Sequence, residues 1–241
     1  MNGITQCAIA PGDSATYSFQ ATQYGTSWYH SHTSLQYGDG VFGPIVIDGP
    51  ASANYDIDLG PYTFNEIFGT TTAWQAGALA HASIQLRGGP PRGTSLLING
   101  TSTNAAGGGT YNNVTIQSGK KYRLRLINTS VNTYIRVSLD NHLLTVIAAD
   151  FVPISPFTTD YLLIAIGQRY DVIIDANQTS GNYWFRADVP KLCFSGTIRN
   201  GSAIWTYGSP ANQTIPTSSP WPNETSQCIE PVVRPYWDEA V

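Results

Sequence analysis

Short stretches of alternating apolar and polar residues, separated by turn sequences, recur along most of this chain. In residues 122–128, Tyr122, Leu124 and Leu126 alternate with Arg123 and Arg125. Successive side chains of a strand point to opposite faces, so this pattern predicts a strand with one apolar face. Similar patterns or short apolar runs predict strands over residues 15–20, 43–48, 134–139, 143–147, 161–165, 170–174 and 183–186.

Turn sequences such as Ser118-Gly119 and Asp140-Asn141 lie between these stretches. Regular short strands with such punctuation predict an all-β fold, a Greek-key β-sandwich. The Ala-rich residues 70–83 favour one or two helical turns. A Gly-Pro boundary near residue 50 and a Pro-rich composition after residue 210 divide the chain into 1–49, 50–210 and 211–241, the last with linker composition.

The composition of the 241-residue chain argues against nucleic acid and membranes as partners. Only 12% of its residues are charged, the net charge is −4 and no basic stripe is present, so neither nucleic acid nor an anionic membrane is expected. No apolar run reaches the roughly 18 residues of a membrane span, and no signal peptide is visible. Seven Asn-x-Ser/Thr sequons nevertheless indicate a secreted glycoprotein: Asn99, Asn113, Asn128, Asn177, Asn200, Asn212 and Asn223.

The chain has three cysteines, an odd number for an exported protein. Cys193 and Cys228 flank a Gly/Ser/Pro-rich stretch and could pair, which would add on the order of 3–4 kcal/mol in the chain-entropy model. Cys7 is then left over. It is either a buried free cysteine or a partner for sequence outside this chain.

Two histidines, His30 and His32, are separated only by Ser31 and follow Trp28 and Tyr29. On a strand their side chains would share one face, roughly 7 Å apart, with Ser31 facing away. Imidazole ligands suit copper, zinc, iron or nickel. The alternative is a pair of ordinary surface histidines on a strand.

The remaining histidines, His81 and His142, belong to no second His-x-His motif, and we expect them to be structural. A metal held by His30 and His32 would therefore need ligands from elsewhere. Asp150 and Asp171 stand near the ends of predicted strands, where we expect their side chains to cap turns.

Longer motifs carry a family resemblance. Residues 24–32 (YGTSWYHSH), 36–40 (QYGDG), 43–50 (GPIVIDGP), 122–130 (YRLRLINTS) and 167–172 (GQRYDV) closely resemble those of fungal laccases of the ascomycete type, which are blue multicopper oxidases. The resemblance extends over residues 3–235.

The resemblance implies cupredoxin-like β-domains and a copper cofactor. His30 and His32 would be the second of four His-x-His motifs, giving one imidazole to each of the paired type 3 coppers of a trinuclear cluster. That cluster reduces O₂ to water with electrons from phenols. The other motifs and the type 1 copper ligands do not occur in this sequence, so we expect the end of domain one, all of domain two and a linker towards domain three, inactive in isolation.

The resemblance also implies a phenol pocket whose second-domain wall includes Gly89, Pro90 and Asn132. Several relatives carry a carboxylate at the position of Asn132, and an amide cannot accept the phenol proton as a carboxylate can. An internal Cys193–Cys228 disulfide and a bond from Cys7 to the third domain are implied too. The alternatives are a phenol-coupling oxidase of secondary metabolism and a non-catalytic, secreted β-sandwich that serves as a binding module.

Overall fold

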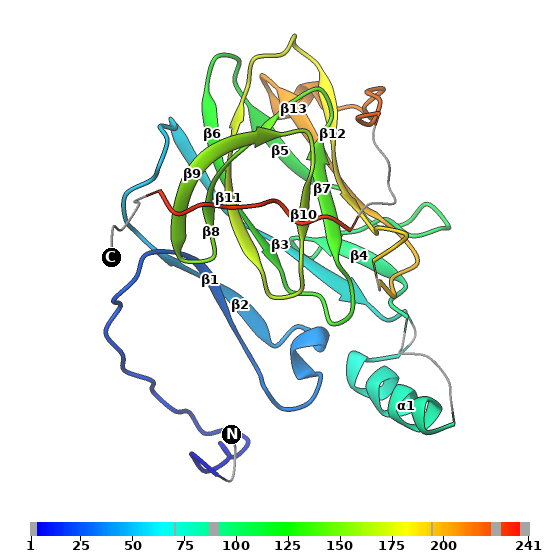
Figure 1. The fold of residues 1–241 in the computed structure, drawn as a ribbon. Coiled ribbons are helices and arrows are strands. Elements are labelled where there is room, and N and C mark those ends of the chain that lie inside the picture. Colours follow the sequence, from blue (N-terminus) through cyan, green and yellow to red (C-terminus); the bar gives the residue numbers. More distant parts are fainter. Residues whose placement is uncertain (1–3, 70, 87–91, 194, 223–227, 237–241) are drawn as a thin grey trace.

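The computed structural model describes residues 4–69, 71–86, 92–193, 195–222 and 228–236 (Figure 1). Strands dominate these residues, and the elements follow one another in this order: β1 (Gly25–His30), η1 (Gln36–Asp39), β2 (Phe42–Ile47), β3 (Ile57–Ile67), α1 (Ala73–Gln85), β4 (Ser95–Ile98), β5 (Asn112–Ile116), β6 (Lys121–Asn128), β7 (Ile135–Leu139), β8 (Leu144–Ala149), β9 (Val152–Thr159), β10 (Leu162–Ile164), β11 (Arg169–Asp175), β12 (Asn182–Asp188), β13 (Gly201–Tyr207) and η2 (Pro210–Asn212).

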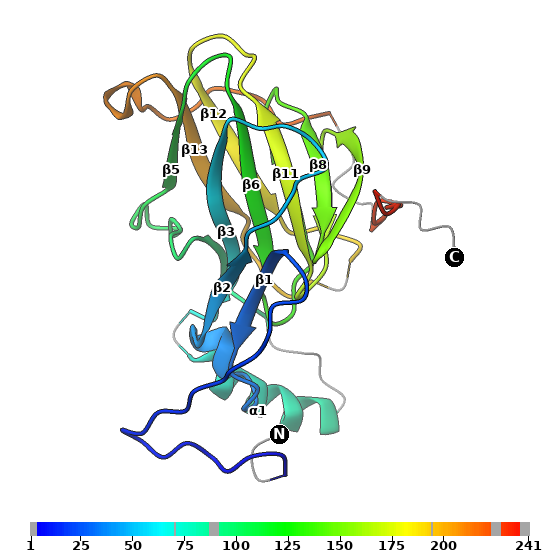
Figure 2. The same cartoon turned by 90° about the vertical axis from the view of Figure 1, so that its left-hand side faces the viewer.

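Two sheets form the layers of a sandwich (Figures 1 and 2). One has five strands in the order β10-β7-β12-β13-β5, and the other has six in the order β4-β3-β6-β11-β8-β9. Most neighbours are antiparallel, but β3 pairs with β6, and β13 with β5, in parallel. A separate two-stranded sheet, β1-β2, lies at one end of the sandwich and contacts β3, β6 and β11. The predicted all-β sandwich is confirmed.

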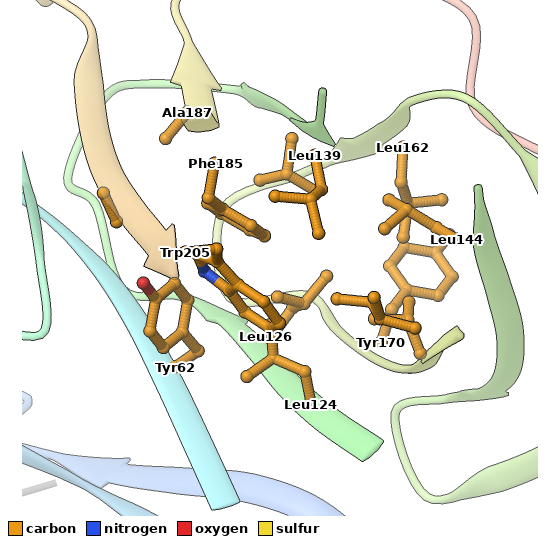
Figure 3. Close-up of a cluster of buried hydrophobic side chains, with 14 of the residues drawn as sticks. Tyr62, Leu124, Leu126, Leu139, Leu144, Leu162, Tyr170, Phe185, Ala187 and Trp205 are labelled. Atoms are coloured by element: carbon orange, nitrogen blue, oxygen red, sulfur yellow. The ribbon is translucent and has the colours of Figure 1, made fainter. Parts of the chain in front are cut away.

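The core lies between the two layers and is built from the apolar face of each sheet (Figure 3). The alternation in β6 places Leu124 and Leu126 here, as predicted, against Phe185 and Trp205 of the opposite layer. All four side chains are 1% exposed or less. Full burial of a large apolar side chain stabilises a fold by about 1.5–3 kcal/mol, so this cluster holds the sandwich together.

The outer face of β6 is also buried, although it carries arginines. Arg123 and Arg125 are 4% and 2% exposed. Both pair with Asp171 of β11, at 2.5 and 3.4 Å, and Arg125 Nη2 also lies 2.7 Å from Asp58 of β3. The prediction that Asp171 caps a turn is wrong, because it stands inside β11 between two guanidinium groups. Asp150 lies in the turn between β8 and β9, but its Oδ1 accepts from the backbone N–H of Arg169 at the start of β11, so its side chain links two strands and does not cap its own turn.

Most predicted strands are present, with ends shifted by a few residues. Residues 43–48 match β2, residues 134–139 match β7, and residues 170–174 match β11. The strand predicted at 15–20 is wrong: these residues have no regular secondary structure and are exposed, and no strand of the described chain pairs with them. Alternation alone predicts a strand, while a ladder also requires a neighbour with free backbone groups.

Helix α1 is longer than the one or two turns predicted, because its N-terminus is well capped. Thr72 and Gln75 form a reciprocal capping box, in which Gln75 N–H donates to Thr72 Oγ1 and Thr72 N–H donates to Gln75 Oε1. Asp39 accepts from the N–H groups of Ala73 and Trp74, at 2.5 and 3.2 Å. A carboxylate here satisfies free donors and favours the positive end of the helix dipole. The helix projects away from the sandwich (Figure 1).

The chain after β13 runs back over the sandwich. Ser218 Oγ donates to Asp140, Trp221 Nε1 donates to the carbonyl of Leu139, and Tyr236 N–H donates to the carbonyl of Pro153. Residues 211–222 and 228–236 are thus attached at several points, although their composition is that of a linker. The described residues contain no helix that is both long and apolar enough to cross a lipid bilayer.

Candidate metal centre

The hairpin β1-β2 positions the histidine pair. The strands are antiparallel, with Thr26 opposite Val46 and His30 opposite Phe42. The pairing continues one residue beyond β1, because Ser31 N–H donates to the carbonyl of Val41 at 2.9 Å. The ladder therefore continues to Ser31, between the two histidines.

The two imidazoles lie side by side. Their ring centroids are 5.9 Å apart, the ring planes differ by 30°, and both residues are exposed. His30 Nδ1 lies 3.0 Å from the carbonyl oxygen of Ser31. A proton on Nδ1 makes this a hydrogen bond and leaves the lone pair of Nε2 free to bind a metal, which is a common arrangement of metal-binding histidines.

Aromatic side chains form a wall beside the pair. The Trp28 ring stacks on His30, with centroids 4.2 Å apart and planes 23° apart, and the Tyr37 ring centroid lies 5.1 Å from that of His30. Burial, and after it the charge of Glu66, raises the pKa of Tyr37 above its ordinary value, so its phenol stays neutral. His30 is thus held against uncharged rings on one side and is open on the other.

Two hollows meet at the histidines. One has a volume of about 370 Å³ and is lined by Trp28, Leu35, Tyr37 and Ile166 together with the pair. The other, of about 880 Å³, separates the pair from Gln6, Ile9 and Tyr17 of the N-terminal segment. A small ligand or an ion has access to both rings.

The donor set fits part of a copper site. Neutral imidazoles are good ligands for copper, and two rings in this arrangement suit two neighbouring ions or one shared ion. Among the described residues, no group of three or more His, Cys, Asp or Glu side chains is placed to hold a metal. His30 and His32 therefore supply two ligands of a centre that requires more.

Of the two remaining histidines, both expected to be structural, His142 has such a role. It is 1% exposed, with Nδ1 against the carbonyl of Asp140 and Nε2 2.7 Å from the hydroxyl of Tyr207. Burial lowers its pKa below the ordinary value. His81 lies exposed on α1, where its Nε2 is 3.2 Å from Nε2 of Gln85.

The predicted phenol wall can be followed only at Asn132, since Gly89 and Pro90 lie outside the described residues. Asn132 lines a hollow of about 280 Å³ between its own loop and α1, together with Val131, Gly77, His81 and Ile84. Leu35 lines both this hollow and the smaller of the two hollows beside the histidine pair.

A buried carboxylate that the sequence analysis missed holds this loop. Glu66, near the end of β3, is 1% exposed, and its Oε2 accepts from the N–H groups of Val131 and Asn132 at 2.6 and 2.8 Å. Its Oε1 accepts from the hydroxyls of Thr133 and Thr197. The sequence does contain a signal for this residue: Glu66 is the one charged residue in the mostly apolar stretch 61–68 (PYTFNEIF).

The cysteines follow the expected pairing. Cys193 and Cys228 form a disulfide, with Cα atoms 5.4 Å apart and a separation of 35 positions in sequence. Cys7 has a free thiol and is exposed, so the alternative of a buried free cysteine is wrong.

One predicted glycosylation site does not fit the fold. Asn128 is fully buried, and its Nδ2 donates to the carbonyls of Thr133 and Ile164 at 2.9 and 3.0 Å. A glycan on this nitrogen would have no room, so the prediction at Asn128 is wrong. Asn223 lies outside the described residues, and the other five sequon asparagines are exposed: Asn99, Asn113, Asn177, Asn200 and Asn212.

Comparison with known proteins identifies the family. A sequence model described as multicopper oxidase matches residues 66–209, and a second with the same description matches residues 1–52. Laccase-3 of Botryotinia fuckeliana is 53% identical over 99% of this chain and 52% of its own length, and a laccase of Neurospora crassa is 47% identical over 95% of this chain and 37% of its own. The chain therefore spans about half the length, or less, of these relatives.

A solved structure agrees with the sequence matches. The crystal structure of laccase from Botrytis aclada superimposes with a TM-score of 0.84 and 44% identity, covering 95% of this chain and 43% of that one. The cupredoxin-like Greek-key sandwich implied by the resemblance is thereby confirmed. The chain belongs to the multicopper oxidase family, a family of copper-dependent oxidoreductases, and within it is similar to the fungal laccases.

Proposed function

We propose that His30 and His32 are copper ligands in an oxidase that couples oxidation of phenols to reduction of O₂. Four phenols each lose one electron and one proton, and one O₂ takes up four electrons and four protons to give two water molecules. The observation that carries the proposal is the pair itself: two exposed, nearly parallel imidazoles 5.9 Å apart at the mouth of two hollows. The fungal laccases to which the chain is similar supply the reaction class.

The chain's own residues hold and shield the centre. Bound copper supplies one-electron redox chemistry and a place for O₂. The Ser31 carbonyl fixes the tautomer of His30 and directs Nε2 outward. The rings of Trp28 and Tyr37 cover one side of His30 and limit the approach of water from that side.

The phenol itself would bind away from the histidines, at a wall formed by Gly89, Pro90 and Asn132. Two observations support this assignment. Asn132 lines the hollow beside α1, and its backbone N–H donates to the carboxylate of Glu66. Its amide can donate a hydrogen bond to the phenol oxygen but cannot take up the phenol proton. The phenol proton must therefore go to an acceptor other than Asn132.

An extracellular location agrees with the surface chemistry. The disulfide joining Cys193 and Cys228 is typical of an oxidising compartment. The five exposed sequons would carry glycans on the folded protein.

Copper and oxygen measurements on the chain test the proposal. We expect copper(II) to bind through the histidine pair and, with a phenol such as 2,6-dimethoxyphenol present, O₂ consumption to stay at the level of free copper, because the described residues supply only two ligands. Failure to bind copper would contradict the assignment of the pair. A blue, oxygen-consuming product would contradict the incomplete centre.

A further inference from the structure

The face of β1 that carries His30 also carries the hairpin's attachment to the sandwich. Thr26, Trp28 and His30 alternate along β1, so their side chains share one face. Thr26 is fully buried, whereas His30 is exposed. One end of this face is thus fixed inside the protein and the other end presents the imidazole.

Directional polar contacts hold Thr26 from three sides. Its hydroxyl donates to Asp171 Oδ1 at 2.6 Å and accepts from Arg125 Nη1 at 3.0 Å. Its carbonyl accepts from Arg169 Nε at 3.0 Å. Hydrogen bonds weaken steeply with misalignment, so these contacts determine where β1 lies along β11 more strictly than apolar contact would.

A second connection reaches the histidine itself. Arg169 Nη1 donates to the carbonyl of Gly167 at 3.2 Å. Gly167 lies beside the Trp28 ring: a Cβ atom added to this glycine would be 3.8 Å from the nearest ring atom of Trp28. Trp28 in turn stacks on His30. The guanidinium of Arg169 therefore joins the backbone at Thr26 to the turn that supports Trp28.

The hairpin needs this attachment because a two-stranded sheet has little stability of its own. Its ladder sets the register between β1 and β2 but not the position of either strand on the sandwich. We propose that Thr26 is a positioning residue for the His30–His32 pair, acting through β1 with Asp171 and Arg169 as its partners. An effect of Thr26 on copper binding rests on the function proposed above. Its effect on the position of the His30 ring is independent of that function.

A ring-current measurement tests the placement without metal. In the metal-free chain, stacking on Trp28 moves the ring proton signals of His30 upfield, and Trp28→Leu gives the reference without stacking. We expect Thr26→Val, which keeps the shape but loses the hydroxyl, to lose most of that upfield shift. Thr26→Ser, which keeps the hydroxyl, should restore it.

The matched control is Thr206→Val in β13. Thr206 is also a buried threonine, 2% exposed with one side-chain hydrogen bond, but it lies in the five-stranded sheet rather than in the layer that contacts β1. Its substitution should leave the His30 signals unchanged. A folded Thr26→Val protein with the full upfield shift would overturn the proposal. If Thr26→Val does not fold, the same His30 signals in Arg169→Gln decide the question. That variant removes the bond to the Thr26 carbonyl and the link to Gly167, together with the ion pair to Asp150.

Copper binding gives the second readout. Loss of groups that orient a metal-binding histidine typically costs 10–100-fold in affinity, and we expect copper(II) to bind Thr26→Val about tenfold more weakly than wild type, in competition with a chelator. If wild type binds no copper, the proposed function fails, while the ring-proton signals still decide the role of Thr26. Equal copper affinity of wild type and a folded Thr26→Val protein would contradict that role.

Discussion

Glu66 provides a sharp test of how the loop that carries Asn132 is held. Its carboxylate accepts two backbone N–H groups on Oε2 and two threonine hydroxyls on Oε1, and none of the ion pairs among the described residues involves it. Two variants separate these contacts. Glu66→Gln keeps one oxygen for the N–H groups, and its amide can donate to the threonine hydroxyls, which can rotate to accept.

Glu66→Met is similar in size but accepts no hydrogen bond. It leaves the N–H groups of the half-buried Val131 and Asn132 without this acceptor, at up to about 1–3 kcal/mol each, so the total loss is at most roughly 2–6 kcal/mol. For Glu66→Gln we expect about 1–2 kcal/mol, since only the charge assistance of the bonds is lost. Urea denaturation followed by circular dichroism measures both values, with the slope against urea compared to confirm a shared unfolding transition.

The free energy of unfolding should fall further in Glu66→Met than in Glu66→Gln. Equal destabilisation by both would mean that the charge of Glu66 matters and its acceptor geometry does not. A loss below about 1 kcal/mol for Glu66→Met would mean that water replaces the carboxylate, contrary to a 1% exposed side chain.

Three further predictions concern stability and modification. Burial lowers the pKa of His142, so near that pKa the unfolded chain binds a proton that the folded chain does not. The free energy of unfolding should therefore be highest above about pH 6.5 and fall as the pH drops below it. In His142→Asn, urea titrations should show a weaker dependence of this free energy on pH. Replacing Cys193 and Cys228 by serine should lower the free energy of unfolding by about 3–4 kcal/mol, and an unchanged urea midpoint would contradict a structural disulfide. Glycopeptide mass spectrometry after expression in a secreting fungal host should find Asn113 glycosylated and Asn128 bare, and a glycan on Asn128 would contradict the buried amide.

Local patterns predicted the parts of the fold that depend on neighbours in sequence. Alternation in residues 122–128 predicted both β6 and the face that enters the core. The same pattern could not show that Arg123 and Arg125 are buried. Their partners Asp171 and Asp58 are 46 to 67 residues away, and only the packing of β1, β3 and β11 brings them together. Several strands were missed, among them β3, β4, β5, β9 and β13. In β13 (Gly201–Tyr207), polar and apolar residues are mixed, and the strand is completed by pairing with β12 and β5.

The candidate site shows the same division. The i, i+2 spacing of His30 and His32 predicted two rings on one side, which requires only an extended backbone. Their support could not be predicted in this way, because Thr26, Trp28 and Arg169 act through contacts between the hairpin and the sandwich. The sequence motifs indicated the family, and the structure adds how the pair is held.

The most direct test of the account is copper(II) binding by the histidine pair, read by electron paramagnetic resonance. Bound copper should show hyperfine coupling to imidazole nitrogen, which disappears in the double variant His30→Ala, His32→Ala. His81→Ala removes another exposed histidine, on α1, and should leave the spectrum unchanged. The same nitrogen couplings in the double variant, or their loss in His81→Ala, would contradict the assignment of this pair as copper ligands.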